Sequence, residues 1–137
     1  MFDNDRLVCL LENIVKAVDL INSQTSWVKK ADDFLLSPEG IFCLSGACMQ
    51  LIFIGENAKT IDNKTNHKYL NAYSDIPWHD IMGLRNIIVH EYHSVDEEEI
   101  FNVIKNDLPT LLNTVQKMII DAKSSNLNNT INTESIR

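Results

Sequence analysis

Apolar positions in the first part of the chain recur with the period of an α-helix. Between Asp5 and Ile21 they are spaced three or four residues apart, so a helix would carry them on one face. These positions are Leu7, Leu10, Leu11, Ile14, Val18 and Ile21. We therefore expect an amphipathic helix from Asp5 to Ile21, followed by a short amphipathic helix around Trp27 to Leu35.

The next segment predicts the central helix of the fold. Ser37 suits the N-cap, Pro38 the first turn, and the Glu39 carboxylate the positive end of the helix dipole. From there to about Ala58 the sequence is apolar on most sides, which predicts the most buried helix of the protein. The apolar positions are Ile41, Phe42, Leu44, Ala47, Cys48, Leu51, Ile52 and Ile54.

A third main helix is expected after a polar stretch. Residues 61–77 are polar and irregular, with one turn expected at 67–72. Pro77 is suited to a first helical turn, so the helix should run from Trp78 to His90.

The last helix is expected to begin at an Asp96 cap and to continue to about Ala122. Pro109 lies inside it and should kink or break it near Asn106, because proline lacks the N–H that the helix needs. Residues 123–137 are too polar to bury much surface, so we expect a flexible C-terminal tail.

Together these elements predict an all-α fold, an up-and-down antiparallel bundle of four main helices with additional short helices. Only 4 Gly and 3 Pro are present, which favours long helices over a turn-rich β fold. A chain of 137 residues suits one domain, which we bound at 1–122.

Composition narrows the possible environments and partners. The net charge of -7 argues against a general nucleic-acid coat, but is compatible with a small basic cleft for RNA or with a basic partner protein. Cys9, Cys43 and Cys48 lack metal-ligand spacing and indicate buried thiols in a reducing cytosol. We expect a cytoplasmic protein without a membrane span, because the N-terminus is acidic and no apolar run approaches about 18 residues.

Candidate chemistry is concentrated between Gly83 and Tyr92. Arg85 can hold a phosphate or stabilise a phosphorane, His90 can exchange a proton near neutral pH, and the Tyr92 hydroxyl can position a phosphate oxygen. RNA carries its own nucleophile, the 2′-hydroxyl. A metal-free transesterification therefore needs only the three roles that these side chains supply.

The spacing of the two charged groups restricts how they could act together. Arg85 and His90 lie about 140° apart around a straight helix, at about 100° per residue. Either the helix loosens at His90, or two copies of the chain meet across a two-fold axis and form one composite cleft. Chemistry alone favours a plainer interpretation, in which Arg85 pairs with a carboxylate while His90 and Tyr92 cap the bundle.

The segment from Arg85 to Tyr92 resembles the Arg-x4-His-x-Tyr motif of HepT-like HEPN proteins, including the frequent Asn after the Arg. Several flanking segments are similar to that family in the same order, over about residues 5–120. They are Ile54-Gly55-Glu56, Ile76-Pro77-Trp78, Ile81-Met82-Gly83-Leu84, Val95-Asp96 and Asn106-Asp107-Leu108-Pro109. One departure is Asn57, where the family usually has Ala.

The resemblance implies α-helical HEPN domains that dimerise, with the motif lining a cleft at the dimer interface. It implies a metal-independent RNA endonuclease without a cofactor, acting as the toxin of a toxin–antitoxin pair. Arg85 and His90 would be catalytic, and Asn86 would orient the site or bind phosphate. The implied partner is a minimal nucleotidyltransferase antitoxin that transfers AMP from ATP onto Tyr92.

Other interpretations stay open from the sequence. Glu56 could support the site by pairing with Arg85, or be a solvated or capping residue. His90 and His93 have the i, i+3 spacing of some metal pairs, but no third ligand is evident, so we expect no metal. The chain could instead be a non-catalytic nucleotide-binding partner of a nucleotidyltransferase, or a purely structural helical dimer.

Overall fold

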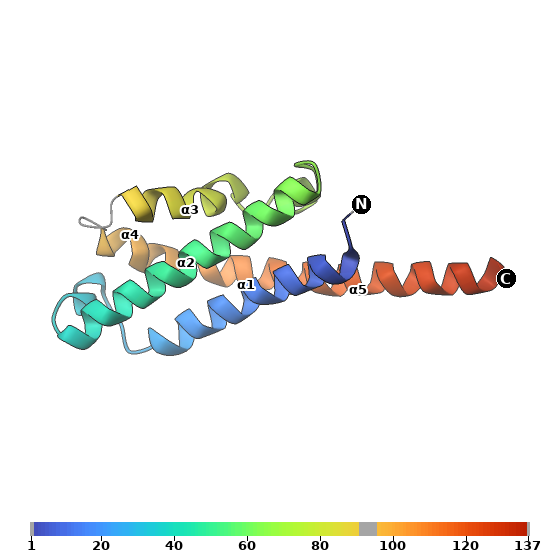
Figure 1. The fold of residues 1–137 in the computed structure, drawn as a ribbon. Coiled ribbons are helices and arrows are strands. Elements are labelled where there is room, and N and C mark those ends of the chain that lie inside the picture. The colour runs from blue at the N-terminus through green and yellow to red at the C-terminus, as the bar shows by residue number, and fades with distance from the viewer. Residues whose placement is uncertain (1, 91–95, 137) are drawn as a thin grey trace.

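The computed structural model describes the backbone of residues 2–90 and 96–136, and the side chains of residues 2–89 and 96–125. Within those residues the fold is entirely helical, as expected (Figure 1). The main helices are α1 (Asn4–Gln24), α2 (Pro38–Lys64), α3 (Trp78–His90), α4 (Glu97–Asn102) and α5 (Leu108–Ile136). Two short 3-10 helices, η1 (Ala31–Phe34) and η2 (Tyr69–Tyr73), and a π-helical segment, η4 (Val103–Asp107), complete the set.

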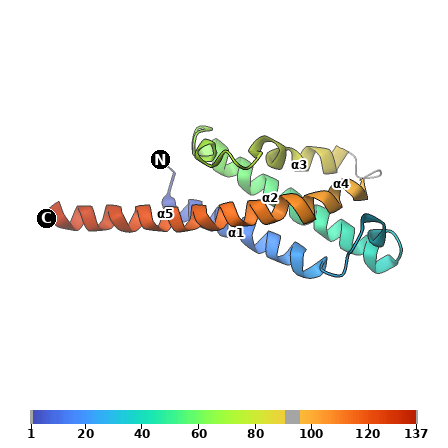
Figure 2. The ribbon, with the colours of Figure 1, turned by 180° about the vertical axis from the view of Figure 1, so that it is seen from behind.

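Helix α2 is the central element of the bundle. It packs against α1 on one side and against α3 on the other, and α5 runs alongside α1 (Figures 1 and 2). The core is formed by the apolar faces of these helices, which bury side chains completely. Among the largest fully buried side chains are Leu11, Ile14, Leu51, Ile54, Leu108 and Met118. The predicted all-α antiparallel bundle is confirmed.

The helical spacing of apolar residues predicts the core correctly, but it also predicted burial on one side of α2 that is exposed. Ile41 is 52% exposed and Phe42 is 81% exposed, although both belong to the segment that was expected to be buried on most sides. The expectation was wrong there because periodicity reports apolar character, not whether a neighbouring helix covers it. The expectation of buried thiols is correct for Cys48, where burial raises the pKa of the thiol to about 11. It was wrong for Cys9, which is exposed.

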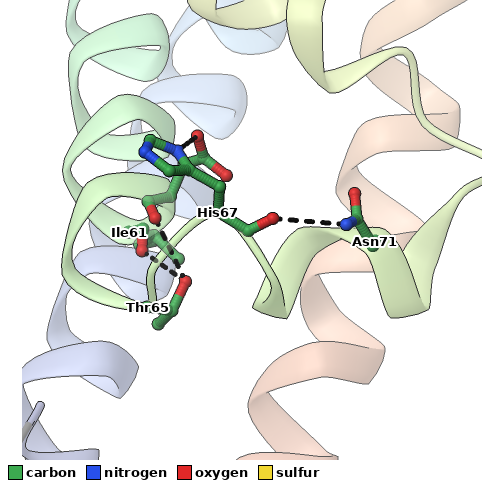
Figure 3. Close-up of polar contacts among 5 residues, drawn as sticks. Ile61, Thr65, His67 and Asn71 are labelled. Atoms are coloured by element: carbon green, nitrogen blue, oxygen red, sulfur yellow. Dashed lines mark hydrogen bonds and ion pairs between the residues drawn. The ribbon is translucent and has the colours of Figure 1, made fainter.

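Helix α2 also continues past its expected end at Ala58, because Ile61 falls on the buried face and extends the apolar contact. Two residues of left-handed backbone, Asn66 and His67, then end it. The turn is held by Thr65, whose hydroxyl donates to the Ile61 carbonyl at 2.8 Å, and by His67, whose Nδ1 lies 2.7 Å from Asp62 Oδ2 (Figure 3). His67 is therefore an exposed residue with a local role in this turn.

The predicted disturbance before Pro109 takes the form of a π-helical segment. The Leu108 N–H donates to the Val103 carbonyl, one residue further back than in an α-helix. Pro109 has no N–H to donate to Lys105, so the regular α-helical ladder cannot close there. The Asp96 side chain caps α4 by accepting the Glu98 N–H at 2.9 Å.

Helix α5 continues through Lys123 without interruption and projects beyond the bundle (Figures 1 and 2). The domain boundary expected at 122 therefore is not marked by a change of secondary structure, and the flexibility of 123–137 stays a prediction.

Among the residues that the structure describes, one helix, α2, is long and apolar enough to cross a membrane by length and composition alone. The core helices of soluble proteins pass the same test, and 44% of the most apolar stretch of α2 is buried against other helices.

Gly55 allows the backbones of α2 and α3 to touch. A Cβ atom at Gly55 would lie 2.8 Å from the Ile81 carbonyl oxygen, which is closer than real Cβ contacts come. A side chain there would push α3 away from α2. The sequence marks Gly55 only as part of a segment similar to the family, and this packing role was not predicted.

The contact at Gly55 predicts opposite effects for two Gly to Ala substitutions within the same helix. Gly55→Ala should lower the free energy of unfolding by about 1–2 kcal/mol, because overpacking outweighs the gain in helix propensity. Gly46→Ala should raise it by up to about 1 kcal/mol, since a Cβ there meets nothing within 4 Å. Urea denaturation measures both changes, and equal effects of the same sign would show that the α2–α3 contact is not tight.

Candidate active site on α3

The motif begins on the exposed face of α3. That helix buries Trp78, Ile81, Leu84 and Ile88 against the bundle. Arg85 and Asn86 lie on its outer side and are exposed. The helix was predicted with the bounds that the structure gives it, because its apolar period is regular and Pro77 precedes its first turn.

Arg85 is paired with Glu56 across the α2–α3 contact. Its Nε atom lies 3.0 Å from Glu56 Oε1, and the two side chains are 52% and 45% exposed. An ion pair that is this exposed to solvent contributes only about 0–1 kcal/mol to the stability of the fold. Its importance is that it fixes the position of the Arg85 side chain. The close approach at Gly55 brings together these two residues, which are distant in sequence.

The remaining motif residues are placed only in part. His90 is the last residue of α3, and only its backbone is described. Tyr92 and His93 fall within residues 91–95, outside the described part of the chain, so their predicted roles stay predictions. The backbone of α3 is helical from Arg85 to His90, so the two Cα positions lie about 140° apart around the helix axis.

Beside the ion pair lies an apolar surface that the sequence analysis did not identify. Phe42, Met49, Phe53 and Glu56 are spaced seven, four and three residues apart, which places them on one face of α2. The three apolar members are 81%, 62% and 44% exposed. Val89, one turn after Arg85 on α3, is 52% exposed. We call Phe42, Met49, Phe53 and Val89 the apolar stripe.

The opposite flank of α3 is acidic. A groove of about 680 Å³ between α3 and α4 is lined by five carboxylates over an apolar floor that includes Ile81 and Leu84. The acidic residues are Asp80, Asp96, Glu98, Glu99 and Asp107. An anionic ligand would be repelled there.

Other candidates from the sequence have structural roles. Trp78 is buried, and its indole N–H donates to the Tyr73 carbonyl at 2.9 Å. The rings of Tyr69 and Tyr73 pack 5.7 Å apart. Burial and the Asp121 carboxylate, which accepts the Tyr73 hydroxyl at 3.0 Å, raise the pKa of Tyr73 well above its usual range. These aromatic residues therefore pack against neighbouring parts of the fold.

Two further features of the described residues lie apart from the motif. An apolar groove of about 580 Å³ between α1 and α2 is lined by Leu20, Trp27 and Phe42, among others. It shares Phe42 with the apolar stripe, but no residue of α3 lines it. Among the side chains that the structure describes, no three His, Cys, Asp or Glu residues gather as metal ligands would.

Comparison with known proteins identifies the family. Residues 14–118 of the 137 match the family model described as "Ribonuclease HepT-like". The chain belongs to the HepT-like ribonuclease family. The matched region contains both halves of the Arg85–Glu56 pair and the whole of the motif, and the resemblance drawn from the motif is thereby confirmed.

Relatives of this HepT-like chain are also named for ribonucleases. A protein of Thermococcus cleftensis named "Probable ribonuclease HepT" is 30% identical over 79% of this chain and 91% of its own length. A "Putative RNase" of Caldanaerobacter subterraneus is 26% identical over 80% of this chain and 90% of its own.

A longer protein of Methanocaldococcus jannaschii, named as a gamma-glutamylcyclotransferase and putative RNase, is 30% identical over 89% of this chain. The match covers only 51% of that relative. No solved structure matches the chain at a significant level.

Proposed function

We propose that this HepT-like chain is a metal-independent RNA endonuclease and the toxin of a toxin–antitoxin pair. The observation that carries the proposal is the motif itself, which begins on an exposed helix face with the Arg85 guanidinium held by Glu56. The family and the names of its relatives support RNA as the substrate. The three free cysteines suit a reducing cytosol, where we place the reaction.

The proposed reaction uses the 2′-hydroxyl of RNA as the nucleophile. One His90 imidazole accepts the proton of that hydroxyl while the hydroxyl oxygen attacks the neighbouring phosphorus, and the departing 5′ oxygen takes a proton from a second, protonated His90 or from water. Arg85 stabilises the charge of the phosphorane, and Asn86, exposed beside it, binds a phosphate oxygen. The P–O5′ bond breaks, which yields a 2′,3′-cyclic phosphate and a 5′-hydroxyl.

We further propose that two copies complete the site as a homodimer. The α3 backbone carries positions 85 and 90 about 140° apart around its axis, which favours a site completed by a second chain. Two copies joined through the α2–α3 face can supply Arg85 from one chain and His90 from the other. The apolar stripe supports this interface, because exposed Phe42, Met49 and Phe53 gain from being covered.

The proposed partner is a minimal nucleotidyltransferase that neutralises the toxin by transferring AMP to Tyr92. An added nucleotide would place a phosphate near Arg85, fill the anion site and repel RNA. Incubation with the cognate enzyme and ATP should add one or more AMP groups to the chain by intact-mass spectrometry and abolish RNA cleavage. The Tyr92→Phe variant should gain none, and an unchanged gain would place the modification elsewhere.

Labelled RNA and purified protein in EDTA test the nuclease directly. We expect cleavage at an undiminished rate, with cyclic-phosphate ends identified by their resistance to a phosphatase that removes 3′-monophosphates. Nucleotide binding without cleavage would favour the alternative, a non-catalytic partner module of a nucleotidyltransferase. Activity that depends on an added divalent metal would contradict the metal-free mechanism.

A further inference from the structure

The side chain of Glu56 meets only one part of the Arg85 guanidinium. The contact joins Oε1 of the carboxylate to Nε of the guanidinium, at 3.0 Å. A guanidinium has five N–H groups, and the outer edge formed by its two terminal nitrogens is the one that binds a phosphate from the front. Among the described side chains, Glu56 is the only recorded ionic partner of Arg85. A carboxylate at Nε therefore leaves the phosphate-binding edge free.

We infer that Glu56 is a positioning residue, which holds the Nε side of Arg85 so that the outer edge of the guanidinium meets the scissile phosphate. The inference rests on the proposed ribonuclease function and deepens it. A free arginine side chain loses about 2 kcal/mol of rotamer entropy when it is fixed. If the Glu56 contact already holds the side chain in the free enzyme, part of this entropy is lost before the reaction begins. The transition state then bears less of the cost, and the reaction is faster.

The backbone around Glu56 is fixed on both sides, as a positioning residue requires. Gly55 contacts the α3 backbone at Ile81, so the two helices cannot slide freely. The Asn57 amide is buried on the other side, where it donates to the Phe53 carbonyl at 2.8 Å and accepts from Asn13 of α1 at 3.3 Å. This bridge to α1 gives a structural role to Asn57, the residue that departs from the family pattern.

The charge of Glu56 has a separate and opposite effect. A carboxylate beside a phosphate site repels RNA and weakens binding, whereas its contact to Nε favours the chemical step. Glutamine keeps an oxygen beside Nε but removes the charge of the ion pair. Alanine removes both. Comparing the two substitutions therefore separates the effect of Glu56 on the orientation of Arg85 from its repulsion of RNA.

Steady-state cleavage of labelled RNA by the full chain tests the inference. Glu56→Gln should keep kcat within about threefold and lower KM, because an oxygen remains beside Nε while the negative charge is lost. Glu56→Ala should lower kcat by about tenfold or more, as expected when a catalytic group is misplaced. The matched control is Glu12→Ala, which removes a 44% exposed carboxylate 3.5 Å from Lys123 and should leave both constants unchanged.

A second background distinguishes positioning from a general structural role. Lysine at position 85 has no Nε edge for Glu56 to hold, so Glu56→Ala should cost less than about twofold when added to Arg85→Lys. A full tenfold loss in that background would overturn the inference. Higher kcat for both Glu56 variants would also overturn it and show that Glu56 competes with phosphate.

Different results would contradict the positioning role of Glu56 and the proposed ribonuclease function. Wild-type cleavage together with an unchanged Glu56→Ala variant removes the positioning role and leaves the nuclease intact. Absence of cleavage by the wild-type chain overturns the nuclease, and the positioning role with it.

Discussion

Replacing Arg85 or His90 by alanine is expected to lower the rate of RNA cleavage by roughly 10²–10³-fold. Arg85 supplies the only charge in the proposed mechanism that offsets the phosphorane, and His90 supplies the proton transfer. Truncation of Arg85 removes few core contacts, since its side chain is 52% exposed. The thermal midpoint of unfolding should therefore change little.

Two control variants test whether the loss of cleavage is specific to the motif. They remove a positive charge or an imidazole elsewhere in the chain. Arg6→Ala removes an exposed guanidinium from α1, and His79→Ala removes an exposed imidazole from the same helix as His90. Both controls should cleave RNA at the wild-type rate. A fully active Arg85→Ala or His90→Ala protein would show that the motif does not catalyse the reaction, and would favour a structural role for it.

Much of the fold follows from the sequence because its helices have one-sided apolar patterns and clear start signals. The Ser37 side chain caps α2 through the Gly40 N–H at 3.0 Å, and Pro77 precedes an α3 with the predicted bounds. The disturbance before Pro109 was also predictable, since it follows from one missing N–H. Its π-helical form was not, because several irregular geometries can satisfy the same missing bond.

The candidate site was less predictable, because it depends on which surfaces meet. Pairing of Glu56 with Arg85 was one of two options in the sequence, and the backbone contact at Gly55 decides between them. The exposure of Phe42 was not foreseen, since an apolar position on a surface and one in a core have the same period. The placement of the His90 side chain and of Tyr92 stays a prediction.

Replacing Met49 by glutamate is expected to separate the proposed dimer into monomers. Met49 is 62% exposed in the middle of the apolar stripe, so the single chain tolerates a charge there. At a two-fold interface the substitution occurs twice and buries two like charges among apolar groups. The dissociation constant of the dimer should rise by at least about a hundredfold, measured by analytical ultracentrifugation.

Ile120→Glu is the matched control, because Ile120 is 64% exposed but lies on α5, away from the motif. It should leave both the dimer and RNA cleavage intact. Met49→Glu should lose cleavage together with dimerisation while keeping its helical circular dichroism. A Met49→Glu monomer that cleaves RNA at the wild-type rate would show that one chain holds a complete site.

Mixing two inactive variants then tests which chains supply the catalytic groups. An Arg85→Ala chain retains His90, and a His90→Ala chain retains Arg85. If the cleft combines Arg85 of one chain with His90 of the other, heterodimers contain one intact pair and the mixture should regain a substantial part of the wild-type rate after subunit exchange. If both groups had to come from the same chain, each heterodimer site would carry a lesion and the mixture would stay inactive. The backbone positions of Arg85 and His90, about 140° apart around α3, favour the first result.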